Sequence, residues 1–200
     1  IPFSEPIADG PVILHANQQV LASGGTVQKC LDMSQEITRT FDIPFLLMSY
    51  YNILFKSGVE RFAAAMAAYD IKGAIVPLLP PEEGQEYLFE MQKQDLAPIL
   101  IFSPTTSSDR MQYISSYGKG FIYCVARKGV TGSKTKFSEG LATYLTKCRK
   151  STPLPLALGG GDALDVDDQV FPVEVGPVLG LGCEAVFALV DQAHLGALPV

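Results

Sequence analysis

The residues best suited to chemistry in this sequence are one carboxylate, one phenol and two glycine-bearing segments. Asp9 lies near the end of an opening loop, Ile1–Gly10, in which Pro2 and Pro6 exclude a regular helix. Tyr123 lies in an apolar run that is typical of a buried strand, and Thr131 and Gly132 lie in a polar segment after it. A carboxylate can accept a proton, a phenol can donate a hydrogen bond, and glycine lets backbone N–H groups approach an anion closely.

Each of these residues also has a purely structural interpretation. Asp9 followed by Gly10 and Pro11 is a good turn and helix-cap sequence whatever the function. Tyr123 in an apolar strand is more often a core residue than a catalyst. The run Gly129–Gly132 is too short to distinguish phosphate binding from an ordinary loop. These alternatives stay open when each residue is taken alone.

Composition narrows the class of protein. The chain has 200 residues, 48% of them hydrophobic and 18% charged, which indicates a globular rather than a disordered protein. A net charge of −6 argues against nucleic acid or an anionic membrane surface as the main partner. We find no apolar run long enough to span a membrane and no metal-binding constellation. The four cysteines have no CxxC spacing and are expected to be reduced packing residues.

Strand-like and helix-like segments alternate along the chain. Apolar positions at helical spacing predict helices from Val12 and from Thr26, and Pro44–Tyr51 is a continuous apolar run of strand length. Four further strands are predicted at 72–77, 98–103, 120–126 and 153–158, with helical patterns between them. This order predicts an α/β fold with a parallel sheet, either a barrel or a doubly wound sheet.

Six segments of the chain, in order and at the right intervals, resemble the tryptophan synthase alpha subunit, a (β/α)8-barrel (TIM-barrel) lyase. They are Ile1–Pro11, Tyr50–Asn52, Pro80–Glu83, Ser103–Thr106, 127–132 and 159–161. The resemblance covers about residues 1–160. It implies an incomplete (β/α)8 TIM barrel that lacks strand 1, helix 1 and most of strand 2.

The resemblance also implies a role for individual residues. Asp9 would bind the indole nitrogen and help to take its proton, and Tyr123 would line the site beside the substrate. Thr131 would contact Asp9, while Gly132 would offer its backbone N–H to the substrate phosphate. The remaining substrate-binding residues implied by the family are Met48, Ile75 and Ile101 around the indole ring and Gly161, Gly182 and Cys183 at the phosphate.

The sequence departs from the family pattern at three places. The family's catalytic glutamate lies three residues upstream of Ile1, so these 200 residues alone are expected to have little or no activity. Leu78 stands where the family usually has aspartate. After Gly160 the match fades: the last 50 residues hold no Lys or Arg and seven acidic residues. We therefore expect residues 1–160 to form a partial barrel and residues 161–200 to be a divergent acidic tail, for which a shifted reading frame or a fusion is the hypothesis.

The function implied by the resemblance is retro-aldol cleavage of indole-3-glycerol phosphate to indole and glyceraldehyde 3-phosphate, in tryptophan biosynthesis. No cofactor and no metal are implied. The expected partners are the phosphorylated indole substrate and the family's beta subunit, a pyridoxal phosphate enzyme; neither nucleic acid nor a membrane is expected, and the expected location is the cytoplasm. The alternative is a non-catalytic fragment that binds the beta subunit or a phosphorylated ligand.

Overall fold

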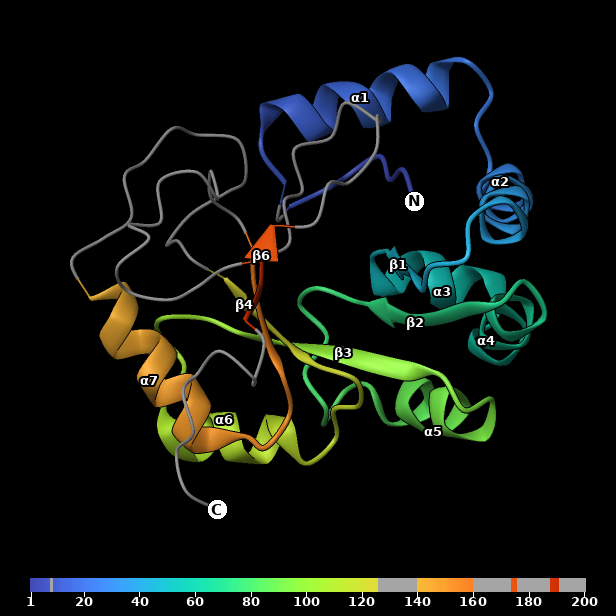
Figure 1. The fold of residues 1–200 in the computed structure, drawn as a ribbon. Coiled ribbons are helices and arrows are strands. Elements are labelled where there is room, and N and C mark those ends of the chain that lie inside the picture. Colours follow the sequence, from blue (N-terminus) through green and yellow to red (C-terminus); the bar gives the residue numbers. More distant parts are fainter. Residues whose placement is uncertain (8, 126–139, 160–173, 176–187, 191–200) are drawn as a thin grey trace. The chain divides into compact units, whose positions relative to one another are not determined.

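The structure is a computed structural model of the 200-residue chain. It describes residues 1–7, 9–125, 140–159, 174–175 and 188–190. The chain divides into two compact units, Ile1–Ile99 and Leu100–Val200. Figure 1 shows the order of the elements along the chain.

The first unit has a parallel arrangement of short strands with helices between them (Figure 1). Its strands are β1 (Phe45–Met48), β2 (Ile71–Ile75) and the first half of β3 (Ala97–Phe102), and each pairs with the next in parallel. Its helices are α1 (Pro11–Ala22), α2 (Val27–Thr40), α3 (Tyr51–Ser57), α4 (Val59–Ala68) and α5 (Gln85–Lys93).

Glycine is required at one point of this sheet. A Cβ atom on Gly73 of β2 would lie 2.2 Å from the carbonyl oxygen of Ala97 on β3. The two strands therefore approach closely only because position 73 has no side chain.

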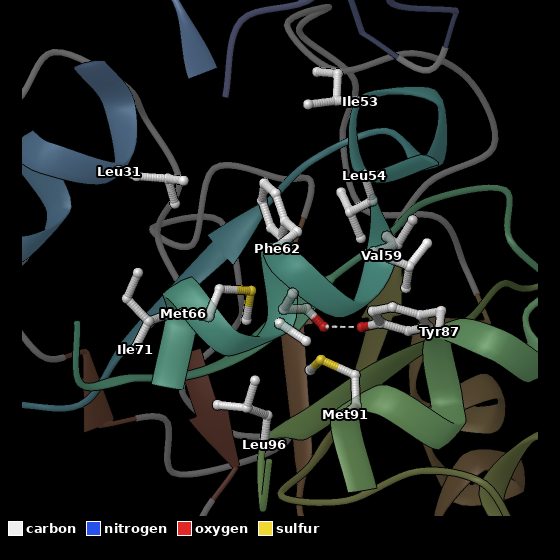
Figure 2. Close-up of a cluster of buried hydrophobic side chains, with 13 residues drawn as sticks. Leu31, Ile53, Leu54, Val59, Phe62, Met66, Ile71, Tyr87, Met91 and Leu96 are labelled. Atoms are coloured by element: carbon white, nitrogen blue, oxygen red, sulfur yellow. Dashed lines mark hydrogen bonds between the residues drawn. The ribbon is translucent and has the colours of Figure 1, made fainter. Parts of the chain in front are cut away.

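The core of the first unit lies between the strands and the helices (Figure 2). Phe62 and Met66 of α4 and Met91 of α5 are buried there together with Ala74 of β2. The phenol of Tyr87 is also buried and donates a hydrogen bond to the carbonyl oxygen of Ala74, 3.1 Å away, so its polar atom is satisfied inside the core.

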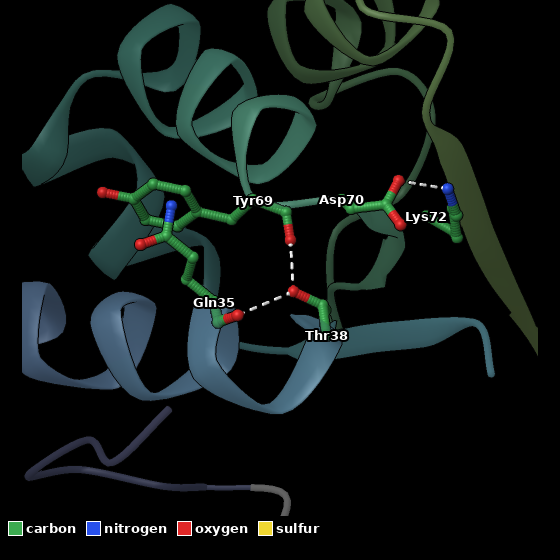
Figure 3. Close-up of polar contacts among 5 residues, drawn as sticks. All are labelled: Gln35, Thr38, Tyr69, Asp70 and Lys72. Carbon is green, nitrogen blue, oxygen red and sulfur yellow. Dashed lines mark hydrogen bonds and ion pairs between the residues drawn. The ribbon is translucent and has the colours of Figure 1, made fainter. Parts of the chain in front are cut away.

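One side chain of α2 makes a hydrogen bond to the turn before β2 (Figure 3). The hydroxyl oxygen of Thr38 lies 2.8 Å from the carbonyl oxygen of Tyr69 and 3.0 Å from that of Gln35. The first contact joins residues 31 positions apart, whereas the nearby Asp70–Lys72 ion pair is local and exposed. Of these polar contacts, the Thr38 hydrogen bond is therefore the one that connects two distant elements, and an exposed local ion pair adds little stability.

The second unit repeats the same layering. The second half of β3 pairs in parallel with β4 (Ile122–Val125), and β4 pairs in parallel with β5 (Leu156–Gly159). Beyond β5 lie two short strands, β7 (Ala188–Val190) and β6 (Glu174–Val175), which pair antiparallel. The helices are α6 (Ser108–Ser115) and α7 (Leu141–Ser151).

Side chains from alternate positions of β3, β4 and β5 form the core of this unit with α6 and α7. Cys124 of β4 and Cys148 of α7 are fully buried in it, and both are free thiols. The expectation of reduced packing cysteines therefore holds for these two, and Cys30 is also free. Cys183 lies outside the described residues.

The parallel α/β prediction is confirmed for β1 to β5, with two differences in detail. The expected strand Pro44–Tyr51 ends at Met48, and Tyr51 already begins α3, because an apolar run alone does not distinguish a strand from a buried helical turn. The helix predicted from Val12 begins at Pro11 as α1, and none of its residues is buried. None of the helices that the structure describes is long and apolar enough to cross a membrane.

We predict that Thr38→Val lowers the free energy of unfolding by about 1 kcal/mol, because the half-buried carbonyl of Tyr69 loses its donor while the side-chain shape is kept. Urea denaturation followed by circular dichroism measures this. Thr40→Val is the matched control, since the Thr40 hydroxyl bonds only within its own helix, to the carbonyl of Glu36. An equal loss in both variants would contradict the prediction.

Candidate active site

The Asp9 side chain does not cap α1; it is held by a contact with another side chain. The N-cap of α1 is Gly10, and no side chain caps it. The Asp9 carboxylate instead accepts a hydrogen bond of 3.1 Å from the phenol of Tyr50. Its backbone N–H donates to the carbonyl of Pro6, which closes the turn of the opening loop. The helix-cap interpretation of Asp9 is therefore not what the structure has.

Tyr50 joins the opening loop to the carboxyl end of β1. It follows β1 by two residues and is the N-cap residue of α3. Its ring lies against Phe3 of the opening loop, with 5.2 Å between ring centroids. In the sequence, Tyr50 stood out only as part of a segment that resembles the family. The signal that could have marked it is a polar aromatic residue directly after a buried strand, where active residues of parallel α/β folds gather.

Met48 and Ile75 form an apolar pair on one face of the first unit's strands. They are direct register partners on β1 and β2, so their side chains point to the same side. Their chain neighbours Leu47, Ala74 and Val76 belong to the core that packs against the helices, so Met48 and Ile75 face away from that core. Met48 is 40% exposed, which leaves its side chain accessible on that face.

Ile101 and Tyr123 form the equivalent pair in the second unit. They are register partners on β3 and β4, and Tyr123 is in turn the partner of Ala157 on β5. The residues on either side of them, at 100, 102, 122 and 124, all belong to the helix-facing core. Ile101 and Tyr123 therefore face away from the helices, where neither is fully buried.

The phenol of Tyr123 is kept protonated and closely packed. Burial raises the pKa of Tyr123 above its ordinary value. A Cβ atom on Gly159 would lie only 2.4 Å from the Tyr123 hydroxyl oxygen and 2.5 Å from its ring. The Tyr123 ring therefore rests on the bare backbone at the end of β5. No feature of the sequence had marked Gly159 as its support.

The predicted site residues thus fall into groups that the structure describes separately. Asp9, Met48 and Ile75 belong to the first unit, and Ile101 and Tyr123 belong to the second. The other predicted residues lie outside the described residues: Thr131, Gly132, Gly161, Gly182 and Cys183. Leu78, in the family's aspartate position, is 69% exposed and has a positive φ of 63°.

The candidate site residues that the structure describes are therefore the Asp9 carboxylate, the Tyr50 and Tyr123 phenols and the apolar side chains of Met48, Ile75 and Ile101. Within the described ranges, no group of three or more His, Cys, Asp or Glu side chains is arranged to hold a metal ion. The Asp9 carboxylate, held by the Tyr50 phenol, can accept a hydrogen bond from a ligand, and Met48, two residues before Tyr50, offers accessible apolar surface.

Three comparisons with known proteins relate the chain to one family. A family model described as "Tryptophan synthase alpha chain" matches residues 1–194. The tryptophan synthase alpha chain of Desulforapulum autotrophicum is 53% identical over 196 residues, which are 98% of this chain and 77% of that protein. The alpha chain of Syntrophotalea carbinolica is 59% identical over 169 residues, which are 84% of this chain and 67% of that protein.

Solved structures agree with these relatives. Tryptophan synthase from Mycobacterium tuberculosis matches with a TM-score of 0.73 at 27% identity, over 80% of this chain and 61% of that one. The tryptophan synthase complex from Pyrococcus furiosus matches with a TM-score of 0.73 at 26% identity, over 82% and 65%. A structure from Aquifex aeolicus VF5 matches with a TM-score of 0.72 at 33% identity, over 82% of this chain and 62% of that one. This chain thus spans about three fifths of the solved chains.

The family match over residues 1–194, the identities above 50% and the shared parallel α/β fold of the TIM-barrel type lead to one conclusion: the chain belongs to the tryptophan synthase alpha chain family, which consists of lyases of tryptophan biosynthesis.

Proposed function

We propose that the protein containing this chain cleaves indole-3-glycerol phosphate to indole and glyceraldehyde 3-phosphate by a retro-aldol reaction. The observation that supports this most directly is the Asp9 carboxylate. It is held by Tyr50 at the carboxyl end of β1, where parallel α/β enzymes have their reactive groups.

Asp9 binds the indole N–H in this proposal. Cleavage needs a proton on the ring carbon that carries the side chain, and positive charge then develops on the ring nitrogen. The carboxylate stabilises that charge and takes up the N–H proton. The electrons of the breaking C–C bond return to the ring, so Asp9 gives the proton back to the ring nitrogen. The side-chain hydroxyl gives its proton to the conjugate base of the acid that protonated the ring carbon, and its carbon becomes the aldehyde. The acid that protonates the ring carbon is the family's glutamate, whose position precedes Ile1 and lies outside this sequence.

As the family resemblance implies, Met48, Ile75 and Ile101 would pack around the indole ring and Tyr123 would lie beside the substrate. Met48 and Ile75 of the first unit, and Ile101 and Tyr123 of the second, are side chains on strand faces turned away from the helices. An indole ring gains most from contact with such flat apolar surface, because burial of apolar area drives binding. Tyr123 adds a protonated hydroxyl beside the substrate.

The phosphate is proposed to bind outside the described residues. Gly132 would offer its N–H and Thr131 would contact Asp9, as the family resemblance implies. Gly161, Gly182 and Cys183 would complete the phosphate site. The physical reason for this choice is the same for the three glycines: without a side chain, a backbone N–H can approach phosphate oxygens closely.

We infer that β1 to β5 are strands 3 to 7 of a (β/α)8 barrel, so that the barrel's first strand, first helix and most of its second strand have no counterpart in this sequence. The parallel register of the five strands supports this order. The division into a barrel part, 1–160, and an acidic tail, 161–200, stays a prediction, and the family match to residue 194 includes most of that tail.

The partner is proposed to be the tryptophan synthase beta chain, a pyridoxal phosphate enzyme, in the cytoplasm. One solved relative is the tryptophan synthase complex from Pyrococcus furiosus. In the first unit, Ile7 of the opening loop is 80% exposed and Phe55 of α3 is 68% exposed. We propose that the partner covers these two exposed apolar side chains, which would remove their apolar area from water. The runner-up function, a non-catalytic binding role, rests on the same surface.

The proposed function is tested by indole release from indole-3-glycerol phosphate, using the protein as its gene encodes it. We predict that Asp9→Asn lowers kcat/KM by about 10²- to 10⁴-fold, because the amide cannot take a proton. Tyr50→Phe is the matched control: it keeps the Asp9 carboxylate and removes the 3.1 Å hydrogen bond, so the loss is expected to be about tenfold or less. Indole release by Asp9→Asn within about threefold of the unchanged protein would refute the role of Asp9. Co-purification with the beta chain without any indole release would favour the binding role.

We further predict that Gly159→Ala lowers kcat/KM by more than about tenfold, because the new methyl group must displace the Tyr123 ring. Introducing Gly159→Ala into a Tyr123→Ala background should cost much less, since the ring it meets is gone. Steady-state kinetics of the four proteins form a double-mutant cycle. Strictly additive losses in kcat/KM would show that the two positions are not coupled.

A further inference from the structure

Two side chains of α7 bind backbone carbonyls just beyond Ile101. The phenol of Tyr144 donates to the carbonyl oxygen of Phe102, the last residue of β3, at 2.8 Å in a buried position. The ammonium of Lys147 donates to the carbonyl oxygen of Thr106 at 2.6 Å in a partly buried position. The two side chains are three positions apart on the helix, so they project from the same side of it.

The segment between these two carbonyls is closed by hydrogen bonds of its own. The Ser103 hydroxyl lies 2.8 Å from the hydroxyl of Thr105 and 3.0 Å from that of Thr106. The Ser103 backbone N–H donates to the Thr106 hydroxyl at 3.1 Å. A short loop that is bonded internally in this way moves as one piece, so its position depends on what holds its ends. Tyr144 holds one end and Lys147 holds the other.

The position of this loop bears on the Ile101–Tyr123 face. Ile101 directly precedes the residue whose carbonyl Tyr144 binds, and Ile101 is the register partner of Tyr123. Burial raises the pKa of the Tyr144 phenol above its ordinary value, so it stays protonated and can donate at neutral pH. The Lys147 bond is charge-assisted, which makes it stronger than a neutral hydrogen bond. Neither side chain is among the residues that would touch the substrate.

We propose that Lys147 and Tyr144 are positioning residues for indole recognition: by holding the Phe102 and Thr106 carbonyls, they set the place of Ile101 beside Tyr123. This inference rests on the proposed function. In this inference, two side chains of α7 determine the position of Ile101, although α7 lies on the helix side of the strands and Ile101 faces the other side. The link is physical, because a carbonyl and the side chain of the preceding residue belong to the same short stretch of backbone.

The test uses Lys147→Met, which keeps the length and apolar stem of the side chain and removes the donor. We expect KM for indole-3-glycerol phosphate and Kd for indole to rise about fivefold, with kcat within about twofold, because a shifted wall weakens substrate and transition state alike. Lys147→Arg restores a charged donor and should return both constants to within about twofold of the unchanged protein. Tyr144→Phe should change them in the same direction as Lys147→Met.

Lys150→Met is the control, since Lys150 is an exposed lysine of the same helix. It should leave Kd and KM unchanged. This chain contains no Trp, so the fluorescence of added indole reports binding without a tryptophan background from these residues. Hydrogen–deuterium exchange of the peptide covering residues 102–107 should rise in Lys147→Met and not in Lys150→Met.

The outcomes separate this inference from the proposed function. If the unchanged protein binds indole and Lys147→Met, folded by circular dichroism, has the same Kd and KM, the positioning role is overturned and the proposed function stands. The positioning role is also overturned if Lys147→Met loses stability without a change in Kd or KM, because the bond is then only structural. If the unchanged protein neither binds nor releases indole, the proposed function is overturned and this role with it.

Discussion

The alternation of side chains along the parallel strands is the constraint on which the rest of this structure depends. One set of positions packs against the helices and forms the two cores. The other set is thereby turned to the opposite face, where Met48 and Ile75 are paired in one unit and Ile101 and Tyr123 in the other. The same burial that stabilises the fold therefore places the side chains proposed to bind the substrate.

Contacts near the carboxyl ends of the strands then fix the loops that carry or adjoin the candidate site residues. In the first unit, Tyr50 holds Asp9 and lies against Phe3, so the opening loop is folded onto the end of β1. In the second unit, Tyr144 and Lys147 hold the end of β3 and its loop. In both units a side-chain donor binds an oxygen atom of a loop or strand near the carboxyl end of a strand, and this contact fixes the position of that segment.

Much of the fold could be predicted because its signals are local. The apolar runs around Ile75, Ile101 and Tyr123 have the length and composition of buried strands, and the structure has strands there. The sequence predicted a helix from Thr26, and the Thr26 side chain accepts a hydrogen bond from the backbone N–H of Lys29 at the start of α2. The start of α3 was missed because the apolar run continues through it, and apolar character alone does not reveal where an extended backbone becomes helical.

The sequence by itself determined the parallel α/β fold, the family and the candidacy of Asp9 and Tyr123, since these depend on residue types, spacing and recurring segments. Only the tertiary structure decided that Asp9 bonds to Tyr50 instead of capping α1, that Gly159 supports the Tyr123 ring and that α7 binds the end of β3. The partners in these contacts are 41, 36 and 42 positions apart. The reason is physical: such contacts arise from the packing of distant elements, and nothing in the neighbouring residues of either partner specifies which distant atom it will meet.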